Sequence, residues 1–294
     1  MKSVYLEAGI SKQSHHQQAK YRKEVKDKKL SYIGFISEIR TIHPGLGLRK
    51  MYNQFQPEGI GRDAFIALGL EAGFRLRAIT NPIRTTYSVK SNRYTNLLVG
   101  KRFTGVNQIW SSDITYFNFK DRFYYIVLIL DVYSRRIVGY SIADNMRAEN
   151  NIKALKMALQ LRGIKDYSSK LIHHSDKGGQ YISNDYTLLL EEHDIQISMC
   201  NEVLENAHIE RANGTIKNEY LNRWPIQSVA QLVKAFNNAV QNYNNRLHNS
   251  IGKTPIEFEN WIRKLTQEER PVLEVFTSTN YSQISVNSKQ LNLF

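Results

Sequence analysis

The feature that most constrains the fold is a change of hydrophobic pattern at Ile109. Residues 109–119 alternate apolar and polar side chains, residues 123–130 are continuously apolar, and residues 136–142 form a third apolar segment. Alternation is typical of a half-buried strand, and a short unbroken apolar run is typical of a strand buried on both faces. Because the connections between these segments are short, they are predicted to form an antiparallel meander.

The segments after this meander predict helices that alternate with two more strands. Strands are expected at residues 170–173 and 195–198, and helices at residues 145–163, 186–192 and 206–221. Three strands followed by α-β-α-β-α predict a mixed five-stranded α/β sheet with flanking helices. We assign this core to residues 109–225, and a C-terminal helical extension and tail to residues 226–294.

The first hundred residues differ in charge from the rest of the chain. They carry 17 Lys and Arg against 7 Asp and Glu, a net charge of +10, whereas residues 101–294 carry 23 against 20, a net charge of +3. A basic segment ahead of a near-neutral body is typical of a protein with a nucleic-acid partner. The alternative is a basicity that only favours solubility.

Three parts are expected in this basic region. Residues 1–29 form a basic N-terminal arm, residues 30–80 a small all-α, helix-turn-helix-like DNA-binding region, and residues 81–108 a linker. In the second part, His43-Pro44-Gly45 ends one helix and two shorter helices follow. Arg49, Lys50 and Arg62 are the predicted DNA contacts there. The alternative is a helical bundle whose charges are merely solvated.

A single cysteine, Cys200, excludes a disulfide within the chain and a Cys/His zinc site of the usual kind. The longest apolar run, residues 123–130, is too short to cross a bilayer, and the N-terminus lacks the apolar stretch of a secretory signal. We therefore expect a soluble protein inside the cell.

Two aspartates stand at unusual places in the predicted sheet. Asp113 lies within the first strand, where Asp is disfavoured and where a buried carboxylate needs a partner or a metal. Asp176 directly follows the fourth strand, and strand ends of α/β sheets are where ligands bind. Gly178 and Gly179 after it permit close approach of another segment.

A third carboxylate, Glu210, lies on the helix that Asn206 is expected to cap. Asn213 and Lys217 follow at helical spacing and share its face. Gly214 costs about 1 kcal/mol inside a helix, which suggests that something approaches this face closely.

Carboxylates from three separate elements are suited to hold two Mg²⁺ ions, with Mn²⁺ as a substitute. One ion activates a water or 3′-OH nucleophile, and the other stabilises the leaving oxygen of a phosphodiester. Taken singly, each carboxylate has an ordinary reading as a turn, capping or solvated residue. The predicted catalytic and metal-binding set is Asp113, Asp176 and Glu210.

This joint pattern resembles the DDE transposases of the retroviral-integrase-like superfamily. It is most similar to the second-reading-frame product, OrfB, of the IS three family of insertion sequences. The resemblance is carried by His43-Pro44 and by the segments WSSDITY (110–116), LDVYSRRIVG (130–139), HSDKGGQY (174–181), NAHIER (206–211) and YNNRLH to TP (243–255).

The resemblance implies an RNase H-like fold and assigns Asp113, Asp176 and Glu210 as metal ligands. It implies Mg²⁺-dependent cleavage at insertion-sequence ends followed by strand transfer, and it places Lys217 on the DNA-contacting face. The segment between Asp176 and Glu210 is slightly shorter than is typical of the family, and Glu205 is the competitor if Glu210 is not the ligand.

The partners implied are double-stranded DNA with terminal inverted repeats and a first-frame helix-turn-helix and leucine-zipper protein, free or as a fusion. The chain has no heptad run long enough to be that zipper. We therefore expect a homo-oligomer on DNA, or a fusion to that partner, in the bacterial cytoplasm at the nucleoid. The rival functions are a nuclease of the same fold and a non-catalytic DNA-binding protein.

Further residues are assigned from their positions near the carboxylates. Asn213, Lys177, Gln180 and Tyr181 are predicted DNA contacts. His173 and His174 are interpreted as structural rather than acid–base groups, and Trp110 as a core residue. Arg246 and His248 either contact phosphate or pin the final helix.

Overall fold

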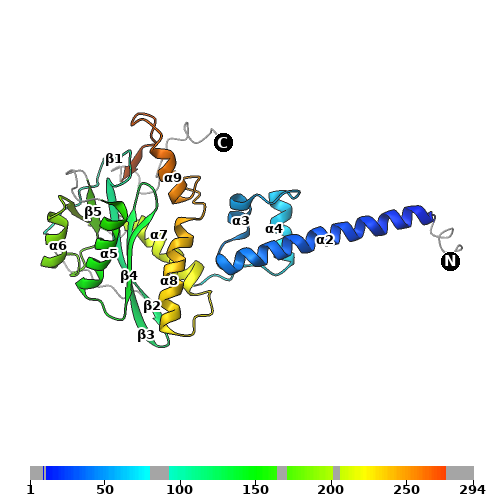
Figure 1. The fold of residues 1–294 in the computed structure, drawn as a ribbon, viewed down its shortest axis with the longest axis horizontal. Coiled ribbons are helices and arrows are strands. Elements are labelled where there is room, and N and C mark those ends of the chain that lie inside the picture. Colours follow the sequence, from blue (N-terminus) through cyan, green and yellow to red (C-terminus); the bar gives the residue numbers. More distant parts are fainter. Residues whose placement is uncertain (1–8, 10, 80–92, 164–170, 201–205, 276–294) are drawn as a thin grey trace. The chain divides into compact units, whose positions relative to one another are not determined.

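The computed structural model describes residue 9 and residues 11–79, 93–163, 171–200 and 206–275. The chain divides into two compact units, residues 1–79 and residues 80–294 (Figure 1). No helix among the described residues is long and apolar enough to cross a membrane.

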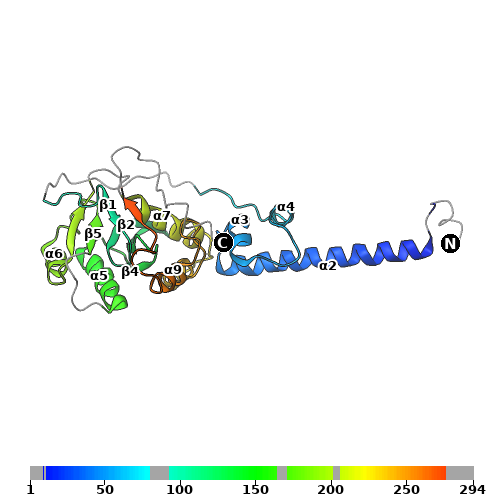
Figure 2. The ribbon, with the colours of Figure 1, turned by 90° about the horizontal axis from the view of Figure 1, so that it is seen from above.

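The first unit consists of three helices, α2 (Lys12–Ile42), α3 (Leu48–Phe55) and α4 (Arg62–Glu71). Their shared core is formed by Ile36, Ile39, Leu46, Leu48, Met51 and Phe65. All of these core residues lie between residues 36 and 65, so the N-terminal half of α2 continues past the bundle (Figure 2). The predicted pair of short helices with a connecting turn is present.

The expected boundary between an arm and a helical region at residues 29 and 30 falls inside α2. Residues 12–30 are rich in Lys and Gln, which are good helix formers, and they contain neither Gly nor Pro. Ser11 begins the helix by accepting a hydrogen bond from the Ser14 backbone N–H at 3.0 Å. A polar composition therefore gave an exposed helix here rather than a loose arm.

The second unit is built on a five-stranded sheet in the order β4-β3-β2-β5-β6. The strands are β2 (Ile109–Phe119), β3 (Arg122–Asp131), β4 (Ile137–Ala143), β5 (Ile172–Ser175) and β6 (Gln196–Met199). β2, β3 and β4 pair antiparallel, and β5 and β6 join in parallel. The predicted meander and the predicted mixed sheet are both confirmed.

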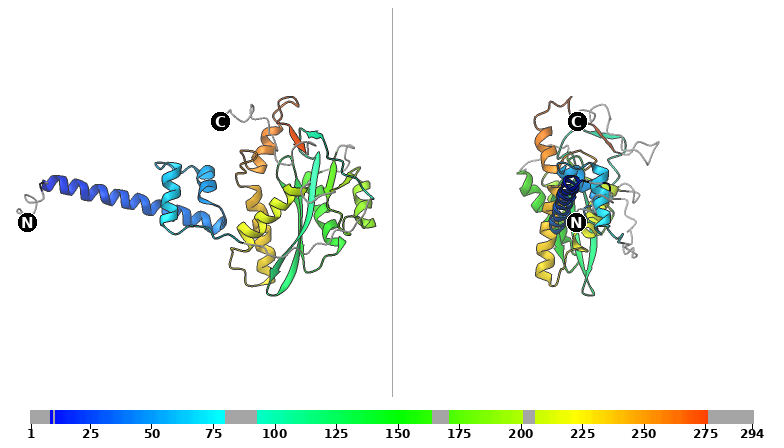
Figure 3. Two further views of the ribbon diagram at one scale, coloured as in Figure 1. Left: turned by 180° about the vertical axis from the view of Figure 1, so that it is seen from behind. Right: turned by 90° about the vertical axis from the view of Figure 1, so that its right-hand side faces the viewer.

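Helices cover both faces of this sheet (Figure 3). On β3, Val127 and Ile129 point to the face covered by α5 (Ala148–Arg162) and α6 (Asn184–Glu191). Ile126 and Leu128 point to the other face, which α7 (Ala207–Thr215), the π-helix η2 (Ile216–Leu221) and α8 (Val229–Asn244) cover. Each such side chain contributes about 1.5–3 kcal/mol on burial, which explains the unbroken apolar run.

The expected linker and C-terminal extension are parts of the same unit. β1 (Lys101–Phe103) pairs antiparallel with β7 (Leu273–Val275), and both pack with α9 (Pro255–Ile262). The apolar stripe of α8 completes the core on the face of α7. The boundaries predicted at residues 108 and 225 therefore fall within one packed body, because these segments carry buried apolar residues such as Phe103 and Phe236.

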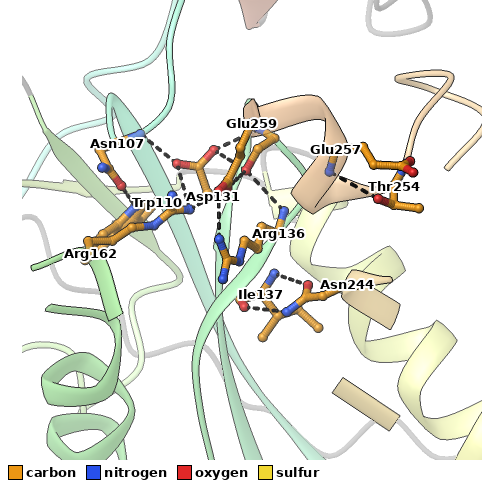
Figure 4. A network of polar contacts seen from close by, with 11 residues as sticks. Asn107, Trp110, Asp131, Arg136, Ile137, Arg162, Asn244, Thr254, Glu257 and Glu259 are labelled. Carbon is orange, nitrogen blue, oxygen red and sulfur yellow. Dashed lines mark hydrogen bonds and ion pairs between the residues drawn. The ribbon is translucent and has the colours of Figure 1, made fainter. Parts of the chain in front are cut away.

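A buried polar network joins α9 to the sheet (Figure 4). Glu259, which is 1% exposed, accepts hydrogen bonds from Arg136 Nη1 and Arg162 Nη2, both at 2.8 Å. Ser134 Oγ donates both to Glu259 Oε1 at 2.8 Å and to Asp131 Oδ1 at 3.0 Å. Three chain segments far apart in the sequence thus meet around two carboxylates.

Candidate active site

The register of the central strands brings Asp113 and Asp176 together. β5 runs parallel to β2, and Ser112 stands opposite Ser175, so the next residue of each strand is an aspartate. The strand predicted at residues 170–173 is shifted to Ile172–Ser175, because His174 and Ser175 continue the pairing with β2 and β6. Asp176 therefore follows the strand directly, as predicted.

The turn after Asp176 explains why Gly178 is a glycine. Asp176 Oδ1 accepts a hydrogen bond from the Gly178 backbone N–H at 3.0 Å. A β-carbon on Gly178 would lie 3.0 Å from that oxygen and 3.3 Å from Gln180 Oε1. The absence of a side chain thus keeps the carboxylate oxygen accessible to the backbone donor.

Helix α7 and η2 run along β2 and contact it at three successive points. Asn206 Nδ2 donates to the Ser112 carbonyl at 3.1 Å, Asn213 Nδ2 donates to Asp113 Oδ2 at 2.8 Å, and Lys217 Nζ donates to Thr115 Oγ1 at 2.7 Å. Glu210 lies between Asn206 and Asn213 in the first turn of α7. Its helix is therefore held against the strand that carries Asp113.

The three carboxylates influence one another electrostatically. Burial, followed by the charges of Asp176 and Glu210, raises the pKa of Asp113 to about 7, against the opposing hydrogen bonds from Asn213 and the Ile114 backbone. Burial also raises the pKa of Asp176. Burial lowers the pKa of Lys217, although the negative charge of Asp113 acts in the other direction. The site is thus short of positive charge.

This shortage of positive charge is the observation used to ask whether the residues present could hold a metal ion. Within the described part of the chain, no group of three His, Cys, Asp or Glu side chains is close enough together to hold a metal ion. Asp113 forms no ion pair with the cationic side chains described. Two carboxylates with raised pKa values, one of them raised partly by its acidic neighbours, fit the preference of Mg²⁺ for oxygen ligands.

Tyr181 does not lie on the surface, where a side chain that contacts DNA has to be. The side chain is 1% exposed, its hydroxyl lies 2.9 Å from Ser112 Oγ, and its ring packs on Tyr186 and His173. The prediction that Tyr181 stacks on a DNA end is therefore wrong for this conformation. The segment after Asp176 folds back, and burial of the aromatic ring prevails over exposure.

The predicted contacts on α7 and η2 point toward the protein. Asn213 is 3% exposed and its amide is used on Asp113, so it positions that carboxylate instead of contacting DNA. Lys217 is half-buried and also lies 5.4 Å from the ring centre of Tyr116. Apart from its chain neighbours and its own helix backbone, no described protein atom lies within 4 Å of where a β-carbon of Gly214 would be, so the expected close approach is not made by the described protein.

The remaining loop candidates are more accessible. Lys177 and Gln180 are half-buried, and Gln180 Nε2 donates to the Met146 carbonyl at 3.2 Å. Glu205, the competitor of Glu210, lies outside the described residues. In the first unit, Arg49, Lys50 and Arg62 are exposed, and Arg62 pairs with Asp63 at 2.9 Å.

The histidines and Trp110 are structural, as predicted. His173 Nε2 lies 2.9 Å from the Tyr186 hydroxyl, and His174 Nδ1 lies 2.9 Å from Ser198 Oγ. Burial lowers the pKa of His173 to about 3, so it is neutral at physiological pH. Trp110 is fully buried.

The C-terminal candidates Arg246 and His248 contact η2 and α8 with their side chains, not the final helix that one of the two alternatives expected them to pin. Arg246 is 5% exposed and forms an ion pair with Glu219 at 2.5 Å. His248 Nε2 lies 2.9 Å from the Tyr243 carbonyl.

Two structural roles near the site were missed from the sequence. Asn206 was expected to cap α7, but its side chain makes no capping bond and instead bonds to Ser111 Oγ and the Ser112 carbonyl. The sequence around Glu259 does not indicate a buried ion pair, because a Glu in the short helix after Pro255 is expected to be solvated unless its arginine partners are known. Both residues act through contacts far along the chain.

Comparison with known proteins agrees with this arrangement. Two models described as "Integrase core domain" match residues 104–202 and residues 194–255. The chain is 32% identical over 222 residues to the Shigella sonnei "Transposase for insertion sequence element IS629", covering 72% of this chain and 73% of that protein. It is 33% identical over 163 residues to the Escherichia coli K12 "Transposase InsF for insertion sequence IS3A", covering 53% and 55%.

Among solved structures, the catalytic core domain of the HTLV-2 integrase, in complex with magnesium, superimposes with a TM-score of 0.43 at 25% identity, covering 56% of this chain and 99% of that one. The sheet order, the flanking helices and the matched models define an RNase H-like integrase core. The chain belongs to the insertion-sequence transposases of the retroviral-integrase-like superfamily. The predicted fold and family are thereby confirmed.

Proposed function

We propose that this transposase cleaves DNA at the ends of an insertion sequence and transfers the 3′-OH ends to a target, using Mg²⁺ held by Asp113, Asp176 and Glu210. The observation that best supports this proposal is the pKa of Asp113, which burial and the charges of Asp176 and Glu210 raise to about 7. Carboxylates removed from water and without an ion pair destabilise a fold unless a cation joins them. Asp113, Asp176 and Glu210 would hold a divalent ion, which would supply that charge and the Lewis acidity that phosphodiester cleavage requires.

The chain's own residues position these carboxylates. Asn213 fixes Asp113 through its amide, and the Gly178 backbone fixes Asp176. Glu210 is exposed in the first turn of α7 and is the third proposed ligand. Asp113 and Asp176 thus form the part of the proposed site that hydrogen bonds within the protein hold in place.

The proposed substrate is double-stranded DNA with terminal inverted repeats. Arg49, Lys50 and Arg62 on the short helices of the first unit, with Lys177 and Gln180 beside Asp176, are the proposed DNA contacts that remain accessible. A homo-oligomer on DNA, and a first-frame partner or fusion that brings a leucine zipper, are part of the same proposal. Basic side chains supply the affinity for phosphates.

The test uses the purified full chain and oligonucleotide duplexes that carry the flanking repeats. With MgCl₂ we expect nicking at the repeat ends and joining to a second duplex, and loss of both with Glu210→Gln. Glu192→Gln, which changes an exposed carboxylate on another helix, is the matched control and should act as wild type.

Three results contradict the proposal. Full activity of Glu210→Gln removes Glu210 from the site. Cutting without joining indicates a nuclease, and DNA binding that never leads to cutting indicates a non-catalytic DNA-binding protein.

A further inference from the structure

The N-terminal half of α2 contributes nothing to the core of its own unit. The buried residues of α2, Ile36 and Ile39, lie in its C-terminal part, and residues 12–30 continue past the bundle (Figure 2). At about 1.5 Å per residue, this projecting segment is about 28 Å long. It carries seven Lys and Arg against two acidic residues, a net charge of +5. A projecting helix with this charge is suited to a polyanionic partner.

The positive charges of the projecting segment fall into two groups. In the first group, Lys20, Lys23 and Lys28 each have an acidic residue four positions away, either Glu24 or Asp27. Opposite charges at this spacing are neighbours on a helix and offset each other. The first group is therefore balanced within the helix itself.

The second group, here called the basic stripe, consists of Arg22, Lys26 and Lys29. These residues stand at i, i+4 and i+7, so they share one face of α2, and no acidic residue lies three or four positions from any of them. All three are exposed, and none forms an ion pair with another described residue. Like charges at this spacing repel one another, so a negatively charged ligand along the basic stripe would stabilise the helix.

The basic stripe lies on the side of α2 that meets the bundle. Arg22, Lys29 and Ile36 follow one another at intervals of seven residues, over which the direction of a side chain turns by only about 20°. Ile36 is fully buried in the core that α2 shares with α3 and α4. A ligand that lies along the basic stripe therefore ends against the bundle.

We propose that Arg22, Lys26 and Lys29 bind the sugar-phosphate backbone of duplex DNA, with the projecting segment lying along the duplex. DNA carries one phosphate for about every 1.7 Å of its axis, so cations spread over about 10 Å of helix meet several phosphates. Such contacts position a protein on DNA without reading its sequence. A second copy of the segment would bring the same charges and be repelled. Because the ligand is DNA, the inference rests on the proposed function and adds a contact surface to it.

Two triple variants separate the basic stripe from net charge alone. Gln replaces each cation, because it is a good helix former and carries no charge. None of the changed residues is buried, so both variants should keep the helix content and the Tm of the wild type. The stripe variant is Arg22→Gln/Lys26→Gln/Lys29→Gln, and the matched control variant, with the same loss of charge from the same segment, is Lys20→Gln/Lys23→Gln/Lys28→Gln.

The measurement is DNA binding by the full chains, followed by fluorescence anisotropy over a series of NaCl concentrations in EDTA. A repeat-end duplex and a duplex of scrambled sequence are compared. The stripe variant should bind both duplexes about tenfold or more weakly than the wild type at about 0.1 M NaCl. Its slope of log K against log salt should fall by about 0.9 for each lost phosphate contact. The control variant should change that slope by less than about 0.9, the value of one contact.

The inference is overturned if both triple variants weaken binding equally, because the affinity then follows net charge and not the basic stripe. Wild-type affinity of the stripe variant also overturns it, as does a loss confined to the repeat-end duplex, which indicates contacts with bases. Failure of the proposed function appears differently: the wild type then binds both duplexes more tightly than the stripe variant but cuts neither of them in MgCl₂.

Discussion

Two clusters of carboxylates lie in the same unit, one buried around Glu259 and one half-buried around Asp113, and their charges are balanced in different ways. Glu259 is surrounded by Arg136 and Arg162, and although burial acts to raise its pKa, these arginines hold the pKa below its usual value. Asp113 has two acidic neighbours and a pKa of about 7. The first cluster contains its own counter-charges, whereas the second has none among the ion pairs of the described residues and is proposed to take them from a metal ion. The comparison therefore separates a structural carboxylate from one that is proposed to be functional.

The largest effect is expected at Asp113. Asp113→Asn should reduce strand cleavage by about 10³-fold or more, because metal assistance contributes several kcal/mol to the transition state. The same change should not lower the free energy of unfolding, since it removes a repelled buried carboxylate. Gel assays of cleavage and urea unfolding check both. Loss of both cleavage and stability would indicate that Asp113 has a structural role, like Glu259.

Glu259→Gln should show the opposite profile. Removing one partner of a buried ion pair destabilises by about 3–5 kcal/mol, since Arg136 and Arg162 lose their counter-charge. Urea unfolding measures the loss, and cleavage per folded molecule should stay near wild type. Glu257→Gln is the control on the same helix, because its capping role with Thr254 needs only an acceptor oxygen. A loss as large at Glu257 as at Glu259 would contradict the comparison.

Mg²⁺ should stabilise the folded protein only by binding at Asp113 and its acidic neighbours. At a concentration of about 100 times Kd, a ligand that binds only the folded state contributes about 2.7 kcal/mol. The Tm of wild type and of Glu259→Gln should therefore rise with MgCl₂, while that of Asp113→Asn should not. An equal rise in all three proteins would show that the ion binds elsewhere.

The smallest effect per step is expected for the free energy of unfolding as the pH is lowered. Because the folded pKa of His173 is about 3 and the unfolded value is about 6.5, the unfolded chain binds the extra proton below pH 6.5. Stability should be complete above pH 6.5 and fall by about 1.4 kcal/mol per pH unit below it. Glu259, with its lowered pKa, should add to the loss only below about pH 4.5, where the unfolded chain begins to protonate it. The measurement uses the Asp113→Asn background, since Asp113 titrates with the opposite sign, and His173→Gln should flatten the profile.

The sheet and the family followed from the sequence because their signals are local. The apolar run at residues 123–130 has the length and composition of a central strand. The segments around Asp113 and Asp176 are recognisable as motifs from their consecutive residues alone. Strand limits moved by two residues at His174 and Ser175, since pairing with β2 and β6 decides them.

What escaped prediction depends on contacts between distant segments. Tyr181 was assigned to DNA because its loop follows Asp176, yet its ring is buried against Tyr186. Asn213 was placed on the correct helix face, but its partner Asp113 is a hundred residues away. The linker and extension were separated from the core because neither β1 nor β7 is long enough to show a period.

The pairing of β1 with β7 has a consequence for how the catalytic unit can be handled. Lys101 stands directly opposite Val275, so two segments far apart in the sequence meet in one small sheet. A fragment cut at residue 109 or 225 loses one partner of that pairing, whereas residues 93–275 retain both. A shortened form of the protein is therefore expected to keep the core around β1, β7 and α9 closed only if it retains both strands.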